Sequence, residues 1–366
     1  MKNKNLHIGY FLAFAYELYL PVAIWLLFFL KYLNFTEVAF IGALATISAN
    51  LFEIPTGAIS DLIGRKYTLF WSFIFSAVGL GVIAVGNVFG VFIVGRIIQG
   101  LGKSLYSGTH ESFMYDTLKS SGNSEEYEHV IARSETITWI GLFVASVLGG
   151  FVYDMWDKGP FIISAVLYIF AAILCLFLDE PKIDSEIFSF KNYMKQNLQG
   201  FSELFKNRKT TIISIVMITV ASGYYFGVRI LGVSQAEQYG LSGTGVGILF
   251  GVGYIFAALA SYLYPKLKKK LGNAQLLMLA TAMLICSFVL APFAGVAVGS
   301  FLIILRISSS TTFGNAQSVI MNGIITSKNR ATALSTLSLL SQIPFTLTFY
   351  FVGRYIDEYS PNSFAL

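Results

Sequence analysis

Long apolar segments separated by short polar ones recur along the whole chain. A helix needs about 20 apolar residues to cross a hydrocarbon core about 30 Å thick, and the pattern predicts eleven such helices. Their expected ranges are 8–31, 36–57, 67–86, 88–112, 134–153, 159–179, 210–233, 244–264, 274–293, 295–321 and 331–353. Residues 361–366 resemble the start of a twelfth helix, and the sequence leaves open whether a twelfth exists. The fold class is therefore expected to be all-α integral membrane.

One long polar stretch divides these helices into a group of six and a group of five. Its basic residues flank Phe201, Leu204 and Phe205, which predict a short amphipathic helix at the membrane surface. The expected domains are an N-terminal six-helix bundle over 1–180, a cytoplasmic linker over 181–209 and an incomplete C-terminal bundle of five helices over 210–366.

Composition supports a membrane protein. Of the 366 residues 55% are hydrophobic and only 12% are charged, whereas a soluble domain has about a quarter charged residues. The net charge of +5 does not indicate nucleic-acid binding, because the charges gather between the apolar segments. With a cytoplasmic N-terminus, 18 of the 25 Lys and Arg residues lie on the cytoplasmic side and three lie outside. This asymmetry predicts that orientation in the cell membrane.

The two halves of the sequence resemble each other at an offset of about 208 residues. Four matches occur in the same order: Thr36 with Thr244, Gly64 with Gly272, Arg96 with Arg306, and 150–154 (GFVYD) with 353–357 (GRYID). Two related bundles around a shared site are a common architecture of secondary transporters.

The turn between the second and third predicted helices carries the strongest local motif. Residues 57–66 read GAISDLIGRK and resemble motif A of the major facilitator superfamily through Gly57, Asp61, Gly64, Arg65 and Lys66. Residues 96–102 (RIIQGLG) resemble the family's motif B, and Asp116 lies where the family often has an acid. The resemblance implies the fold of that superfamily and transport by alternating access.

The charges of motif A are expected to form a conformational switch. Asp61, Arg65 and Asp116 would latch the two halves in one state, because such a cluster has a different energy in each state. The alternative is that Arg65 and Lys66 only set the topology.

Ionisable residues inside a bilayer are costly and indicate function by default. Glu17 and Arg96 have similar expected depths, so they are predicted to pair across a cavity, with Glu17 as a candidate proton carrier. A purely structural ion pair is the alternative. Arg306, the repeat partner of Arg96, is expected to line the other half of the cavity.

The fourth predicted helix carries a polar stripe at helical spacing. Its residues are Arg96, Gly100, Lys103, Ser107 and Glu111, with Gln99 beside them. Such a face must look into protein or a wet cavity. Glu53 is expected to neutralise Lys103 as a structural pair.

Glycines at spacings that permit close helix contact occur in the fifth and eighth predicted helices. They are Gly141, Gly149, Gly150, Gly247 and Gly251. In the superfamily these two helices meet between the halves, so the resemblance implies a sliding surface; ordinary tight packing is the alternative.

Residues 141–150 resemble the family's antiporter motif C in their last two glycines, but Ala145 and Ser146 replace its Gly-Pro, which weakens an antiporter assignment.

The sequence has no Walker phosphate loop, no His/Cys metal spacing and no nucleophile motif, so no enzyme, cofactor or metal site is expected. The predicted function is that of a monomeric, proton-coupled exporter of amphipathic compounds or drugs, whose partners are a small-molecule substrate, protons and the lipid bilayer. One alternative is a proton symporter that imports a sugar-like or organic-acid solute. Another is a non-transporting membrane sensor or a truncated gene product.

Overall fold

The computed structural model describes residues 2–181, 198–325 and 330–364; within helices, the side chains of 53–59 and 61 are among those it does not describe. In these ranges the regular structure is helical, with no β-strand. The chain divides into two compact units. Unit 1 is Met1–Leu33 with Leu44–Ser189, and unit 2 is Asn34–Ala43 with Phe190–Leu366. The sequence placed 34–43 in the N-terminal bundle, whereas their contacts group them with unit 2.

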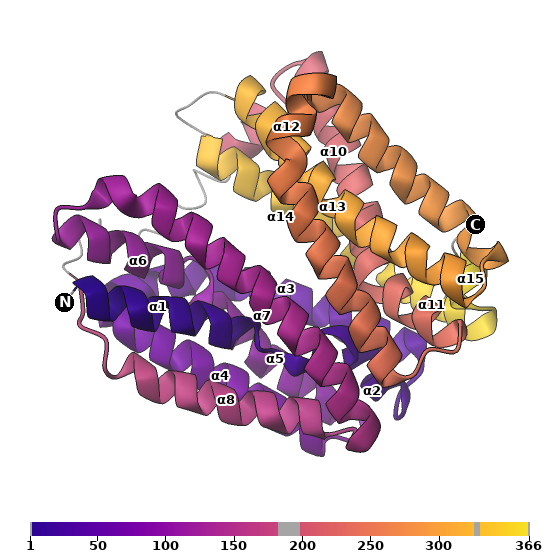
Figure 1. Cartoon of the computed structure of the whole chain (residues 1–366), viewed down its shortest axis with the longest axis horizontal. Helices are drawn as coiled ribbons and strands as arrows, with labels where there is room; N and C mark the ends of the chain where they lie inside the picture. The colour runs from indigo at the N-terminus through magenta and orange to yellow at the C-terminus, as the bar shows by residue number, and fades with distance from the viewer. Residues whose placement is uncertain (1, 182–197, 326–329, 365–366) are drawn as a thin grey trace. The chain divides into compact units, whose positions relative to one another are not determined.

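Unit 1 is built from α-helices joined by short turns (Figure 1). Its elements are α1 (Lys2–Glu17), η1 (Leu20–Ala23), α2 (Trp25–Leu30), α4 (Arg65–Val85), α5 (Phe89–Tyr106), α6 (Thr109–Ser120), η2 (Ser124–Glu126), α7 (Tyr127–Met155) and α8 (Gly159–Cys175), together with the greater part of α3 (Phe35–Ile63). Helix α4 packs against α5 and α8, and α1 packs against α7.

Two predicted helices of unit 1 are interrupted. The first, expected over 8–31, breaks at η1, where Pro21 supplies no backbone N–H for an α-helical hydrogen bond. The fourth, expected over 88–112, ends at Tyr106, because Gly108 has a positive φ of 74° and starts α6 in a new direction.

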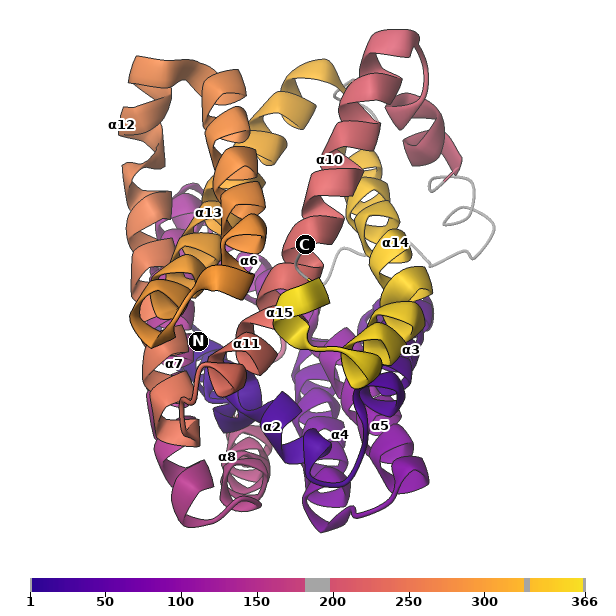
Figure 2. The same cartoon turned by 90° about the vertical axis from the view of Figure 1, so that its right-hand side faces the viewer.

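Unit 2 consists of the second half of the chain. Its elements are α10 (Arg208–Phe226), η3 (Gly227–Leu231), α11 (Gly232–Gln238), α12 (Gly243–Val289), η4 (Ala291–Phe293), α13 (Val296–Ile324), α14 (Arg330–Glu358) and α15 (Pro361–Phe364), and residues 198–204 are also helical. Helix α12 packs along α13, and α10 packs along α14. The 47-residue α12 contains the eighth and ninth predicted spans and turns sharply at Gly272 (Figure 2).

The glycine match between the halves extends to backbone conformation. Gly64, between α3 and α4, has a φ of 89°, and Gly272, inside α12, has a φ of 77°. Only glycine adopts this region without strain, so both halves make the same kind of reversal at the matched position.

Eight helical segments in the described part of the chain are long and apolar enough to cross a membrane. One of them is α12, which holds two predicted spans, and α8 is a shorter apolar helix of 17 residues. The remaining predicted span corresponds to α5, whose apolar character is reduced by Arg96 and Lys103.

Candidate functional site

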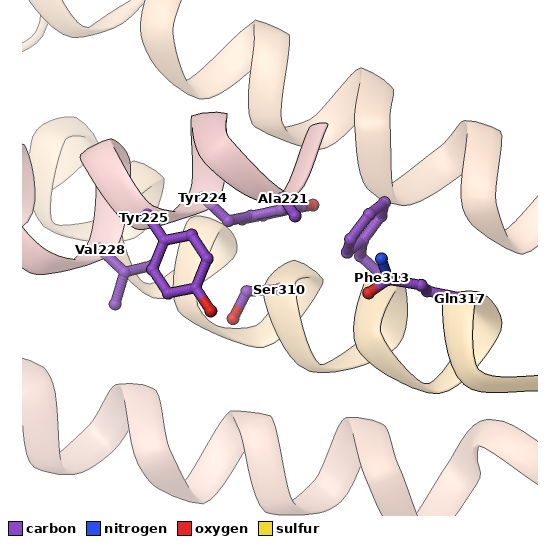
Figure 3. Close-up of a pocket in the computed structure, with 7 residues that line it drawn as sticks. All are labelled: Ala221, Tyr224, Tyr225, Val228, Ser310, Phe313 and Gln317. Atoms are coloured by element: carbon purple, nitrogen blue, oxygen red, sulfur yellow. The ribbon is translucent and has the colours of Figure 1, made fainter. Parts of the chain in front are cut away.

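A cavity of about 270 Å³ lies between α10, η3 and α13 of unit 2 (Figure 3). It is lined by Ala221, Tyr224, Tyr225, Val228, Ser310, Phe313 and Gln317. A second cavity, of about 230 Å³, shares Ala221, Tyr225 and Gln317 with the first and adds residues of α14. The two cavities therefore share part of their lining within unit 2.

Helical spacing explains how these side chains reach the cavity. Ser310, Phe313 and Gln317 are separated by three and four residues, so they share one face of α13. Ala221 and Tyr225 share a face of α10 in the same way. Figure 3 shows these two faces turned toward each other.

Some lining groups are fixed by their neighbours. The Tyr224 hydroxyl donates to the carbonyl of Ala280 at 2.8 Å, and its ring lies 5.3 Å from that of Phe313. The Ser310 hydroxyl donates to the Ile307 carbonyl at 2.7 Å. The cavity thus has a rigid aromatic wall, which suits a planar apolar ligand.

Gln317 supplies the cavity's amide group. No hydrogen bond joins this amide to another residue in the described part of the chain, and the lining residues of both cavities are uncharged. A ligand here would meet aromatic faces, hydroxyls and one amide. From the sequence, Tyr224, Tyr225 and Phe226 of the seventh predicted helix were expected to suit an apolar cavity, and the first two line this one. Phe313 was not singled out, because aromatic residues are frequent throughout the membrane helices.

Arg306 lies one helical turn before Ser310 on α13 and is 1% exposed. Its Nη1 donates to the Gly227 carbonyl at 2.9 Å and to Gln235 Oε1 at 3.1 Å. The guanidinium is therefore held inside unit 2, behind the cavity wall rather than on it.

The structure does not bring together Glu17 and Arg96. Arg96 donates from Nη1 to Gln99 Oε1 at 3.0 Å and lies 4.9 Å from the rings of both Trp25 and Phe29. The charged groups that act on Glu17 are Lys103 and Glu135.

The break at η1 explains this difference. The expected depths assumed one continuous first helix, but α1 ends at Glu17 and the chain resumes as α2 at Trp25. Arg96 is level with α2, and Lys103, about 10 Å further along α5, is the cation near Glu17.

The predicted polar stripe is also interrupted. Because α5 ends before Gly108, Glu111 belongs to α6 and does not continue the face that holds Arg96, Gly100 and Lys103. Glu53 lies in α3, but its side chain is outside the described residues, so its expected pairing with Lys103 stays a prediction.

Part of the motif A cluster is assembled within unit 1. Arg65 Nε lies 3.4 Å from Asp116 Oδ2, with both side chains mostly buried, and Arg65 Nη1 donates to Ser60 Oγ at 2.7 Å. The surroundings of Gly57 and of the Asp61 side chain are outside the described part of the structure. The place of Asp61 in the switch therefore stays a prediction.

Glu180 is a member of this region that the sequence did not reveal. Its carboxylate accepts hydrogen bonds from the backbone N–H groups of Arg65 at 2.6 Å and Lys66 at 2.9 Å. It caps α4 at the turn made by Gly64, where negative charge is favourable. The only trace of this role in the sequence is an acidic residue directly after the sixth predicted helix, and it lies far from motif A along the chain.

The glycines of the fifth predicted helix lie on α7, close to the first span. A Cβ on Gly141 would lie 2.8 Å from Cβ of Glu17, and one on Gly149 would overlap the Leu20 carbonyl. Close packing inside unit 1 thus accounts for these two. Gly150, Gly247 and Gly251 are buried, the last two in α12, and the sliding surface stays a prediction.

Comparison with known proteins decides the family. The sequence model of the Major Facilitator Superfamily matches residues 6–349. The chain belongs to this superfamily. It is thus a multi-pass member of a family of membrane transporters rather than of an enzyme family, as the sequence predicted.

Several relatives show how far the similarity extends. The MFS-type transporter YxaM of Bacillus subtilis (strain 168) is 24% identical over 267 residues, which are 70% of this chain and 65% of YxaM. The quinolone resistance protein NorA of Staphylococcus aureus is 24% identical over 275 residues, 73% of this chain and 68% of NorA. The chain thus spans just under two thirds of YxaM.

Solved structures share the fold. The nucleoside transporter NupG superposes with a TM-score of 0.81 at 15% identity, covering 100% of this chain and 94% of NupG. A bacterial homolog of the human lysosomal transporter Spinster, inward-facing and unoccupied, gives a TM-score of 0.73 at 16% identity, covering 99% and 87%. At this identity the likeness concerns the fold alone.

Proposed function

We propose that this member of the superfamily is a proton-coupled secondary transporter that exports small amphipathic compounds by alternating access. The observation that carries the proposal is the cavity of unit 2, whose wall is aromatic and uncharged. Such a lining gains most of its binding free energy from apolar contact and holds few fixed polar groups. Similarity to NorA, a quinolone resistance protein, also favours a drug-like solute.

Glu17 is the proposed proton carrier. It is a half-buried carboxylate in the first span, and Lys103 and Glu135 act on it with opposite effects. A carboxylate held between a cation and another acid can exchange its proton when either neighbour moves. Arg96 takes no direct part, because its partners are Gln99 and two aromatic rings.

The Arg65–Asp116 pair, with Gly57, Asp61, Gly64 and Lys66, is the proposed conformational switch. We place the N-terminus in the cytoplasm and the protein in the cell membrane, as a monomer. The cytoplasmic location of the switch follows from this orientation.

Transport by everted membrane vesicles tests the proposal. The probe is tritiated 2-naphthamide, a neutral planar compound, and the lumen is made acidic. We expect wild-type vesicles to accumulate the probe, and Glu17→Gln vesicles to show the same slow entry with or without the gradient. Glu358→Gln, at an exposed acid of unit 2, is the matched control and should behave as wild type.

The outcomes separate the parts of the proposal. Wild-type accumulation that ignores the gradient would exclude proton coupling. Accumulation only in right-side-out vesicles with an acidic exterior would favour the second candidate, uptake by proton symport. The second cavity gives that candidate support through Ser318, Ser338 and Ser341, which suit a polar solute such as a sugar or organic acid.

A further inference from the structure

Arg306 carries a positive charge that no acidic residue in the described chain balances at ion-pair distance. All its hydrogen-bond partners are neutral. Besides Gly227 and Gln235, Nε donates to Ser287 Oγ at 3.0 Å and Nη2 donates to the Ser287 carbonyl at 3.2 Å. Neutral dipoles solvate the guanidinium, but its net charge remains.

The backbone of unit 2 is shaped around this side chain. Gly227 begins the π-helical turn η3, and its carbonyl accepts both from Gly232 N–H and from Arg306 Nη1. A Cβ on Gly227 would lie 2.5 Å from Cδ of Arg306, so only glycine permits this approach. π-Helical turns often mark functional positions.

A neutral residue would cost less free energy to bury at such a position. An unbalanced charge at membrane depth costs free energy even when its hydrogen bonds are satisfied. The guanidinium also stacks on the Phe288 ring at 4.7 Å. Four hydrogen bonds and one aromatic contact hold the charge in place rather than remove it.

The charge lies close to the cavity. Arg306 precedes Ser310 by four residues on α13, about 6 Å along the helix axis, and its acceptor Gly227 adjoins Val228. Helices α10, α12 and α13 contain no Asp or Glu. Among the acids on the other helices of unit 2, Glu237 of α11 and Asp357 and Glu358 of α14 form no ion pair with Arg306 in the described structure, so its field acts on the cavity. At an effective dielectric constant of about 20, this favours an anion over a cation by well over tenfold.

We propose that Arg306 is the electrostatic selector of this cavity, which prefers aromatic carboxylates, accepts neutral aromatic solutes and disfavours aromatic cations. The inference rests on the proposed function, because it takes the cavity to be the place where a solute binds. It adds the charge of that solute, which the uncharged lining alone does not specify.

A substitution of Gln235 can neutralise the electrostatic field of Arg306. Its Oε1 accepts from Arg306, and its buried Nε2 has no hydrogen-bond partner among the residues that the structure describes. Gln235→Glu keeps the accepting oxygen, loses no hydrogen bond at Nε2 and neutralises Arg306 with almost no change in shape. Gln238→Glu is the matched control, since Gln238 lies on the same helix and accepts from the exposed backbone N–H of Asn362.

The experiment measures equilibrium binding to the purified full-length chain in nanodiscs at neutral pH and without any gradient. The probes are tritiated 2-naphthoate, 2-naphthamide and 2-naphthyltrimethylammonium, which share one ring system. We expect wild type to bind the carboxylate at least tenfold more tightly than the cation, with the amide between them. Gln235→Glu should reduce the ratio of carboxylate affinity to cation affinity at least tenfold, and Arg306→Gln should also reduce it. Gln238→Glu should leave this ratio unchanged.

Three results would overturn the inference: an unaltered ratio in folded Gln235→Glu, a wild-type preference for the cation, or no binding of any probe at millimolar concentration. Because no gradient is involved, the result is separable from transport. If the purified protein prefers the carboxylate as expected but vesicles do not transport 2-naphthamide, the proposed function is wrong and the inference about Arg306 stands. If vesicles transport 2-naphthamide but Gln235→Glu binds the carboxylate and the cation with the wild-type ratio of affinities, the inference about Arg306 is wrong and the proposed function stands.

Discussion

The carboxylate of Asp357, at the end of α14, caps the N-terminus of α3 at Thr36. Oδ2 accepts from the Thr36 backbone N–H at 2.9 Å and from its hydroxyl at 2.6 Å, and Oδ1 accepts from the Phe35 N–H at 2.8 Å. These groups all lie in unit 2. They explain why 34–43 group with that unit, since an acid far along the chain satisfies the first donors of the helix.

Loss of this cap should destabilise unit 2. We expect Asp357→Ala to lower the free energy of unfolding by about 1 kcal/mol, the usual value of a cap, and Asp357→Asn to lower it by less. Thermal unfolding of the purified protein, followed by circular dichroism, measures the change. Glu358→Ala, which removes an exposed pair with Arg354, should have a much smaller effect. Equal losses in both alanine variants would contradict the capping role.

Gly64→Ala should be more harmful than the same change at another glycine with positive φ. Gly64 has φ 89° and ψ 160°, and Gly272 has φ 77° and ψ 163°, so the backbone strains an alanine to a similar degree at both positions. At Gly64 the added Cβ would also lie 2.8 Å from Cδ of Glu180, whereas at Gly272 it meets nothing within 4 Å. Backbone strain in this region costs about 1–3 kcal/mol. The difference between Gly64→Ala and Gly272→Ala in the same unfolding measurement therefore isolates the contact with Glu180. If the two variants lose the same stability, Glu180 does not constrain this turn.

Exchanging the charges of Arg65 and Asp116 should restore part of what each single change removes. We expect Arg65→Gln and Asp116→Asn each to slow vesicle transport of 2-naphthamide several-fold, because each removes one member of a mostly buried ion pair. The double variant Arg65→Asp with Asp116→Arg should recover some of the initial rate. Lys4→Gln, in an exposed pair with Asp179, is the control. A double variant slower than both singles would count against a switch based on this pair.

Phe313→Ala should raise the transport KM for 2-naphthamide about five- to tenfold, because the aromatic contact of the cavity wall is lost. Phe301→Ala, on the same helix but 61% exposed, should leave KM unchanged. Initial rates at varied probe concentration give both constants. A change in maximal rate alone would place Phe313 outside the binding step.

The sequence alone predicted the fold class, the apolar spans and the family motifs, and the family match confirmed the superfamily. It could do so because a bilayer imposes a length and polarity on each span, and because motif A is a local run of residues. The matched glycines at 64 and 272 likewise depend only on local backbone conformation.

The tertiary structure decided which distant residues meet. Depth along an assumed straight helix paired Glu17 with Arg96, but a single proline shifted the chain and brought Lys103 near Glu17 instead. Glu180 at α4, Asp357 at α3 and Gln235 at Arg306 were equally inaccessible to sequence reasoning. Each contact joins residues more than 70 positions apart, and its existence depends on how helices pack and where they break, which no local pattern records.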